Sequence, residues 1–191
     1  EIALDLVERG VHASLSVRSP INLVHRDVLG QATQVTAIRL SKLPTAIGDA
    51  LATLLRQLTV GNLSRWGLST ATHSPLRQLR EHGNTPVIDV GTLARIRSGQ
   101  IKVYPGIAAF TPQGLRFTDG REQLFDSVIL ATGFTAGLDR LFPEQKIPVG
   151  ANGLPREIAG QGDFAGIYFV GFDTRQPGGL LRSIARQATQ V

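Results

Sequence analysis

The N-terminal residues carry a helical pattern that is followed by an alternating one. Ile2 and Leu6 fall on one face, and Gly10 is a typical C-terminal stop, so the first ten residues are predicted to form a helix. The next stretch, Val11–Val17, alternates apolar residues with serine and predicts a strand that closes before Pro20. Because no capping residue stands ahead of the helix, we expect that further sequence preceded it.

Between residues 31 and 82 the apolar spacing is mostly helical. Three helices are predicted, over Val35–Leu43, Ala46–Val60 and Pro75–Glu81. The apolar stripe of the second helix is interpreted as a packing face, with a partner-docking or membrane-touching face as the alternative.

After residue 84 the pattern changes to short strands separated by turn residues. An antiparallel meander is predicted over about 101–125, with strands at Ile101–Tyr104, Gly106–Phe110, Leu115–Thr118 and Gln123–Phe125. Two further runs, Ser127–Thr132 and Gly166–Val170, are continuously apolar and are each followed by glycine. Runs of this kind are typical of central strands in a parallel sheet that helices cover on both faces.

Composition fits one globular unit, or two small ones. The chain has 191 residues, of which 42% are hydrophobic, and its net charge is +5 from 20 basic and 15 acidic residues. This charge permits an anionic partner, but the basic residues are spread along the chain and only one Trp and two Tyr accompany them. Nucleic-acid binding is therefore not expected. The absence of Cys excludes disulfides, thiolate metal sites and a dithiol redox pair within this chain.

No apolar run approaches the roughly 18 residues that a membrane span needs, and Asp49 and Arg56 interrupt the longest helical candidate. The first ten residues also lack the basic region of a signal peptide. We therefore expect no transmembrane segment and a cytoplasmic location.

The order helix, strand, Arg18-Ser19 is typical of the second half of a βαβ unit that binds a dinucleotide. In such units, the residue that ends the second strand contacts the adenosine ribose, and an arginine there accommodates the 2′-phosphate of NADP. A guanidinium suits this task because it offers a fork of donors and keeps its charge. The spacing alone also fits an ordinary solvated arginine at the end of a strand.

Glycines after the two apolar runs form a second signal. Ligands of open α/β sheets lie beyond the carboxyl ends of the strands, where a side chain would block their approach to the backbone. Gly178-Gly179 also precedes a helical pattern that starts at Leu180, and free N–H groups at a helix start attract anions. Ordinary sheet-ending turns would leave the same pattern.

The usual catalytic groups are absent or unconvincing. The four His residues lack the spacing of metal ligands, there is no G-x-S-x-G motif, and Asp89 and Asp126 are interpreted as turn or capping groups. No catalytic residue is therefore assigned. Redox chemistry would belong to a bound cofactor, which the protein would orient.

Several segments in order resemble the flavin-containing monooxygenases, with the greatest similarity to the YUCCA-like branch. They include EIALDL at residue 1, VRSP at 17, HRDVLG at 25, TPVIDVGT at 85, IRSGQIKV at 96, PGI at 105, VILATGF at 128 and GIYFVGF at 166. The resemblance spans almost the whole chain.

This resemblance implies a Rossmann-like enzyme that uses FAD and NADPH and transfers one oxygen atom from a flavin C4a-hydroperoxide, formed with O2, to a small organic substrate. The cofactor-binding residues that it implies are Arg18, Ser19, Arg26, Ala131, Thr132, Gly133, Phe134, Gly171, Phe172, Gly178, Gly179 and Leu180. Residues 1–140 would be an NADPH-binding domain that lacks its first strand and glycine fingerprint and carries a helical insertion over about 31–82. Residues 141–191 would be the returning C-terminal segment of the FAD-binding domain.

The chain therefore resembles the C-terminal half of such an enzyme, and we expect it to be inactive without the missing N-terminal half. A Baeyer–Villiger monooxygenase and an amine N-hydroxylase share this plan and remain alternatives. A second alternative is a non-catalytic nucleotide-binding or protein-interaction module.

Overall fold

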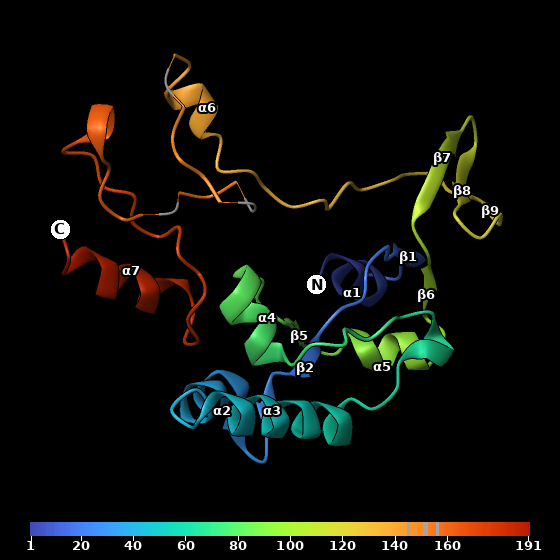
Figure 1. Ribbon diagram of the computed structural model, residues 1–191. Coiled ribbons are helices and arrows are strands. Elements are labelled where there is room, and N and C mark those ends of the chain that lie inside the picture. Colours follow the sequence, from blue (N-terminus) through green and yellow to red (C-terminus); the bar gives the residue numbers. More distant parts are fainter. Residues whose placement is uncertain (145, 151–152, 156) are drawn as a thin grey trace.

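The fold combines parallel strand pairs, an antiparallel sheet and several helices (Figure 1). The computed structural model describes residues 1–144, 146–150, 153–155 and 157–191. Within them the helices are α1 (Ile2–Glu8), α2 (Thr33–Leu40), α3 (Thr45–Thr59), α4 (Pro75–His82), α5 (Thr92–Arg97), α6 (Leu138–Leu141) and α7 (Leu180–Ala188), with 3-10 turns η1 (Ser64–Trp66) and η2 (Gly162–Phe164). The strands are β1 (Ala13–Ser16), β2 (Leu23–His25), β3 (Asp27–Val28), β4 (Gln31–Ala32), β5 (Val87–Asp89), β6 (Ile101–Tyr104), β7 (Ile107–Thr111), β8 (Gly114–Phe117) and β9 (Glu122–Leu124).

Two parallel strand pairs, β1–β6 and β2–β5, hold the main core. Helix α1 packs against β1, and α5 packs against β6 and α1. Their apolar residues meet in one cluster of buried side chains that includes Leu23, Leu63, Leu93 and Ile101. The structure confirms that the fold is mixed α/β with parallel strands, as predicted from the sequence.

Strands β7, β8 and β9 form the antiparallel sheet, in that order. The prediction that Ile101–Tyr104 opens this meander is wrong, because these residues pair in parallel with β1. Tyr104 nevertheless links the two sheets, since its ring stacks on Phe117 with ring centroids 4.4 Å apart and meets Phe125 edge-on.

Between β3 and β5 the chain is mostly helical, as predicted. Helix α4 has a clear start signal, because Ser74 accepts a hydrogen bond from the Arg77 amide and Pro75 occupies the first helical position. Its end is equally clear, since Gly83 adopts the left-handed conformation with φ of 68°. Helices α2 and α3 pack on each other, and α3 packs on α4 and β2.

The two apolar runs predicted as central parallel strands are corrected by the structure. Ser127–Thr132 is extended but pairs with no strand among the described residues, and Ile129 and Leu130 are exposed by 59% and 67%. In Gly166–Val170, Tyr168 forms only an isolated antiparallel bridge to Ala159. An apolar run becomes a central strand only where neighbours complete its ladder, and the described residues place none there.

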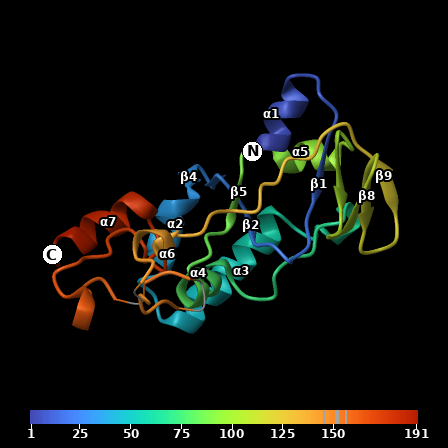
Figure 2. The ribbon, with the colours of Figure 1, turned by 90° about the horizontal axis from the view of Figure 1, so that it is seen from above.

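The C-terminal segment and the β7–β9 sheet lie at opposite ends of the molecule in both ribbon views (Figures 1 and 2). Thr174 ties this segment to the end of α4, because its hydroxyl donates to the Gly83 carbonyl over 2.8 Å. The predicted division of the chain near residue 140 stays a prediction.

Candidate cofactor-binding site

The carboxyl ends of β1 and β6 lie side by side. The Val17 amide donates to the Tyr104 carbonyl at 2.9 Å, and the Ser16 hydroxyl donates to the Pro105 carbonyl at 2.8 Å. These bonds continue the pairing beyond the last strand residues. They bring Arg18 and Ser19 to the edge of the parallel pair, where ligands of α/β folds bind.

Arg18 is exposed at this edge and packs against a glycine. A Cβ built on Gly106 would lie 3.2 Å from Arg18 Cβ and 3.5 Å from Thr118 Cγ2, so a larger residue at 106 would crowd the arginine. No carboxylate of the described residues forms an ion pair with Arg18. The guanidinium is thus a cation with its donors available to an anionic ligand.

Arg26 occupies the end of the other parallel pair. Its amide donates to the Asp89 carbonyl over 3.3 Å, and its side chain is exposed. Asp89 caps α5 by accepting the Leu93 amide at 2.9 Å, and its other oxygen lies 3.4 Å from Nδ1 of His25. The capping role predicted for Asp89 is confirmed. Arg18 and Arg26 belong to different strand pairs.

The Ala131–Phe134 segment is exposed and unpaired among the described residues. Gly133 has φ of 90°, a conformation that favours glycine, and a Cβ there would meet no atom within 4 Å. Phe134 has a relative exposure of 106%, so its ring has no packing partner in the described residues. Within the described residues, no hydrogen bond or ion pair joins this segment to Arg18.

Gly171 and Gly179 both lie against α7, Gly179 at its start and Gly171 beside Ile184 and Gln187 farther along the helix. The Gly171 amide donates to Gln187 Oε1 at 2.7 Å, and the Phe172 ring meets Phe169 edge-on. The helix begins at Leu180 with no side-chain cap on its first amides, because Gly179 is the N-cap. The predicted residues 171–172 and 178–180 therefore gather around one helix, at the end of the molecule that carries the C-terminus (Figure 2).

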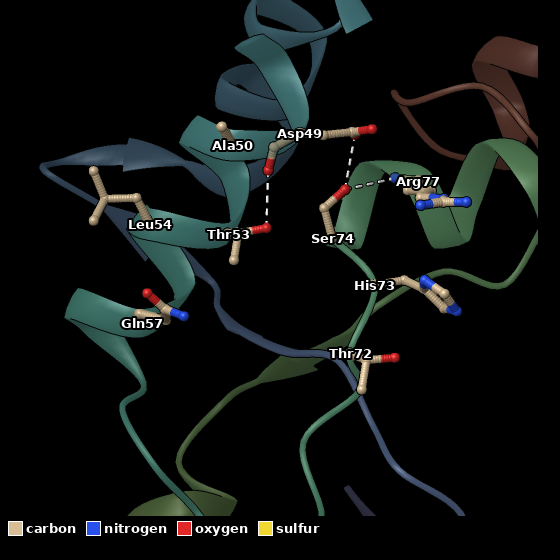
Figure 3. Close-up of a pocket in the computed structure, with 9 residues that line it drawn as sticks. All are labelled: Asp49, Ala50, Thr53, Leu54, Gln57, Thr72, His73, Ser74 and Arg77. Carbon is tan, nitrogen blue, oxygen red and sulfur yellow. Dashed lines mark hydrogen bonds between the residues drawn. The ribbon is translucent and has the colours of Figure 1, made fainter. Parts of the chain in front are cut away.

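Sequence reasoning missed a polar region under α3. A hollow of about 420 Å³ lies between this helix and the loop before α4 (Figure 3). Asp49 accepts hydrogen bonds there from Ser74 at 2.7 Å and Arg80 at 2.8 Å. Partial burial opposes ionisation of Asp49, but these bonds outweigh it and lower the pKa of the carboxyl.

Deeper in the same region, Arg56 is only 8% exposed and Asn22 only 1%. One Arg56 nitrogen donates to Asn22 Oδ1 over 2.5 Å and to the Ala71 carbonyl over 2.8 Å. Burial lowers the pKa of Arg56. The sequence signal was present, since Asp49 and Arg56 interrupt an apolar helix seven residues apart, but it was interpreted only as evidence against a membrane span.

A second hollow of about 350 Å³ runs beside β6. Its lining contains Arg65, Lys102 and Arg121 but no carboxylate, and the Arg65 guanidinium lies 3.9 Å from the centre of the Trp66 ring. Within the described residues no group of His, Asp and Glu could hold a metal ion. No helix of the described part is long and apolar enough to cross a membrane.

Comparisons with known proteins identify relatives along almost the whole chain. A probable indole-3-pyruvate monooxygenase of Arabidopsis thaliana, YUCCA7, is 35% identical over 92% of the chain. The indole-3-pyruvate monooxygenases YUCCA4 of Oryza sativa subsp. japonica and YUCCA6 of Arabidopsis thaliana are 36% and 32% identical over 94% and 100% of it. The chain spans only 41%, 41% and 46% of these relatives, respectively. No family model matches the chain.

Proposed function

Since this chain is a relative of the YUCCA branch of the flavin monooxygenases, we propose that it is the NADPH-binding part of an FAD- and NADPH-dependent monooxygenase. The enzyme would insert one oxygen atom of O2 into a small organic substrate. Indole-3-pyruvate, the substrate in the relatives' names, is the first acceptor to assay.

The observation that carries the NADPH assignment is the position of Arg18. Its guanidinium stands without a carboxylate partner among the described residues, at the carboxyl edge of a parallel strand pair. Gly106 beside it leaves room that a Cβ would fill. A guanidinium whose N–H groups are available as donors, next to the backbone of a glycine, fits the 2′-phosphate of NADPH. Ser19 would add a hydroxyl donor, and Arg26 would be a more distant helper.

Fewer residues of this chain are proposed to approach the flavin than to bind NADPH, and they lie around α7. The backbone amides at the start of α7, which no side chain caps, and the turn at Gly178-Gly179 would donate hydrogen bonds to an electron-rich group of the flavin. When bound, NADPH supplies a hydride and FAD supplies the chemistry that activates oxygen. The chain's own residues would bind and orient these cofactors, and none is assigned a proton transfer.

We further propose that this Rossmann-like unit needs the rest of the relatives' sequence. Its exposed run Ser127–Thr132 and the exposed Phe134 would be covered by strands and side chains that the N-terminal half supplies. The chain alone would then bind NADPH weakly, would not retain FAD and would be inactive.

Flavin titration tests this proposal. The chain alone, titrated with FAD, is expected to leave the flavin absorption and fluorescence unchanged. The chain extended at its N-terminus to the length of its relatives is expected to purify with FAD and to oxidise NADPH when substrate is present. Tight FAD binding by the chain alone, or an extended protein that ignores both cofactors, would refute the assignment.

A further inference from the structure

Gly106 stands at the corner where β6 leads into β7, next to the end of β1 (Figure 1). It is buried, and its φ is not positive, so the backbone conformation at this position does not require glycine. Space does require it, because a Cβ on residue 106 would lie 3.2 Å from Arg18 Cβ and 3.8 Å from Arg18 Cα. The small size of residue 106 therefore allows Arg18 to lie directly against this corner.

The backbone that carries Arg18 is fixed on both sides. Before it, the Val17 amide donates to the Tyr104 carbonyl at 2.9 Å. After it, the Ile21 amide donates to the Ser69 carbonyl at 2.9 Å. Since both bonds are made within the chain, Arg18 Cβ has a defined place before any ligand binds. A cation held in this way loses less freedom on binding than one on a loose loop.

The corner itself is held from behind by the antiparallel sheet. The Thr118 amide donates to the Gly106 carbonyl at 2.8 Å, and the Ser16 hydroxyl donates to the Pro105 carbonyl at 2.8 Å. Thr118 Cγ2 would also lie 3.5 Å from a Cβ on residue 106, so the space is closed on that side. A side chain at 106 would therefore crowd Arg18 and change the directions in which its guanidinium can point.

We propose that Gly106 is a positioning residue for Arg18, and that the corner backed by Thr118 sets the preference for a coenzyme with a 2′-phosphate. The inference rests on the proposed function, since it takes Arg18 as the group that contacts this phosphate. It deepens that function by assigning part of the coenzyme selection to a residue without a side chain. The physical reason is geometric, because a charge-assisted bond from a guanidinium to phosphate depends on the placement of its fork of donors.

Calorimetric titration of the chain extended to its relatives' length, with 2′,5′-ADP and 5′-AMP, tests the inference. Gly106→Ala is expected to weaken binding of 2′,5′-ADP about threefold to tenfold and to leave 5′-AMP within about twofold of the parent. Gly48→Ala is the matched control, because it adds the same Cβ at another buried glycine, 2.7 Å from the Leu40 carbonyl oxygen. It is expected to keep the parent's preference, and circular dichroism reports whether each variant is folded.

A second variant tests whether the added Cβ acts through the space shared with Thr118. Thr118→Ser in the Gly106→Ala protein removes the methyl group on the far side of that space and is expected to restore part of the preference. A parent that does not prefer 2′,5′-ADP would refute the proposed function and this inference together. Where the parent does prefer it, three results would overturn the inference alone: Gly106→Ala that keeps the preference, Gly48→Ala that loses it equally, or a double variant with no recovery.

Discussion

Asn22 holds the helical segment to the parallel strands through a network with very little solvent access. Its side chain accepts from Arg56 and donates to Gln78 Oε1 at 2.7 Å and to the His73 carbonyl at 3.1 Å. Asn22→Ala removes all of these bonds and leaves the buried guanidinium with the Ala71 carbonyl. A bond to a charged group contributes about 1.5 to 3 kcal/mol and each of the two neutral bonds about 1 kcal/mol, so the expected loss is about 3.5 to 5 kcal/mol.

Urea unfolding followed by circular dichroism measures this loss. Whole domains are stable by about 5 to 15 kcal/mol, so the variant is expected to be only marginally folded. Asn84→Ala, at an exposed asparagine, is the control and is expected to stay within about 0.5 kcal/mol of the parent. Adding Arg56→Met to Asn22→Ala is expected to recover part of the loss, because no buried charge is then left unpaired. A loss below about 1 kcal/mol would refute the reasoning.

Two further predictions follow from the site geometry. The pKa of Asp49 is lowered in the folded protein by its hydrogen bonds, so its stabilising effect is present above the ordinary value of 3.8 and is lost as the pH falls through the lowered pKa. Asp49→Asn is therefore expected to destabilise the protein at pH 7 in urea titrations, with a difference that shrinks below pH 3.8, and a constant difference would contradict this. Gly178→Ala is expected to loosen the start of α7, measured as faster amide exchange over residues 180–188. The reasons are its φ of 118° and a Cβ that would lie 2.5 Å from Arg182 Cδ, and unchanged exchange would argue against them.

Local sequence patterns predicted the helices well, because helix formation depends mainly on residues that are close together in the sequence. The helices predicted over Ala46–Val60 and Pro75–Glu81 are examples, and the structure confirms both as α3 and α4. Strand pairing depends on distant residues instead. The parallel partner of Ile101–Tyr104 lies near residue 13, and nothing in the local pattern distinguishes it from the adjacent meander.

The same limit explains the corrected strand at Ser127–Thr132. Its apolar pattern is that of a central strand, but pattern alone cannot supply the neighbours that a ladder requires. The candidate site also contains features that the sequence predicted and features that it did not. The position of Arg18 at a strand end followed from spacing, whereas the inward-facing charges of α3 depend on where Asn22 and Arg80 come to lie.

Binding of 2′,5′-ADP compared with 5′-AMP isolates the 2′-phosphate contact and tests the central claim most directly. Calorimetric titration of the extended protein is expected to show tighter binding of 2′,5′-ADP. Arg18→Ala is expected to weaken it about tenfold to a hundredfold, the value of one charge-assisted contact, with 5′-AMP unaffected. Arg140→Ala, at an exposed arginine on α6, is the control and is expected to change neither. An Arg18→Ala protein that still prefers 2′,5′-ADP as strongly as the parent would contradict the account.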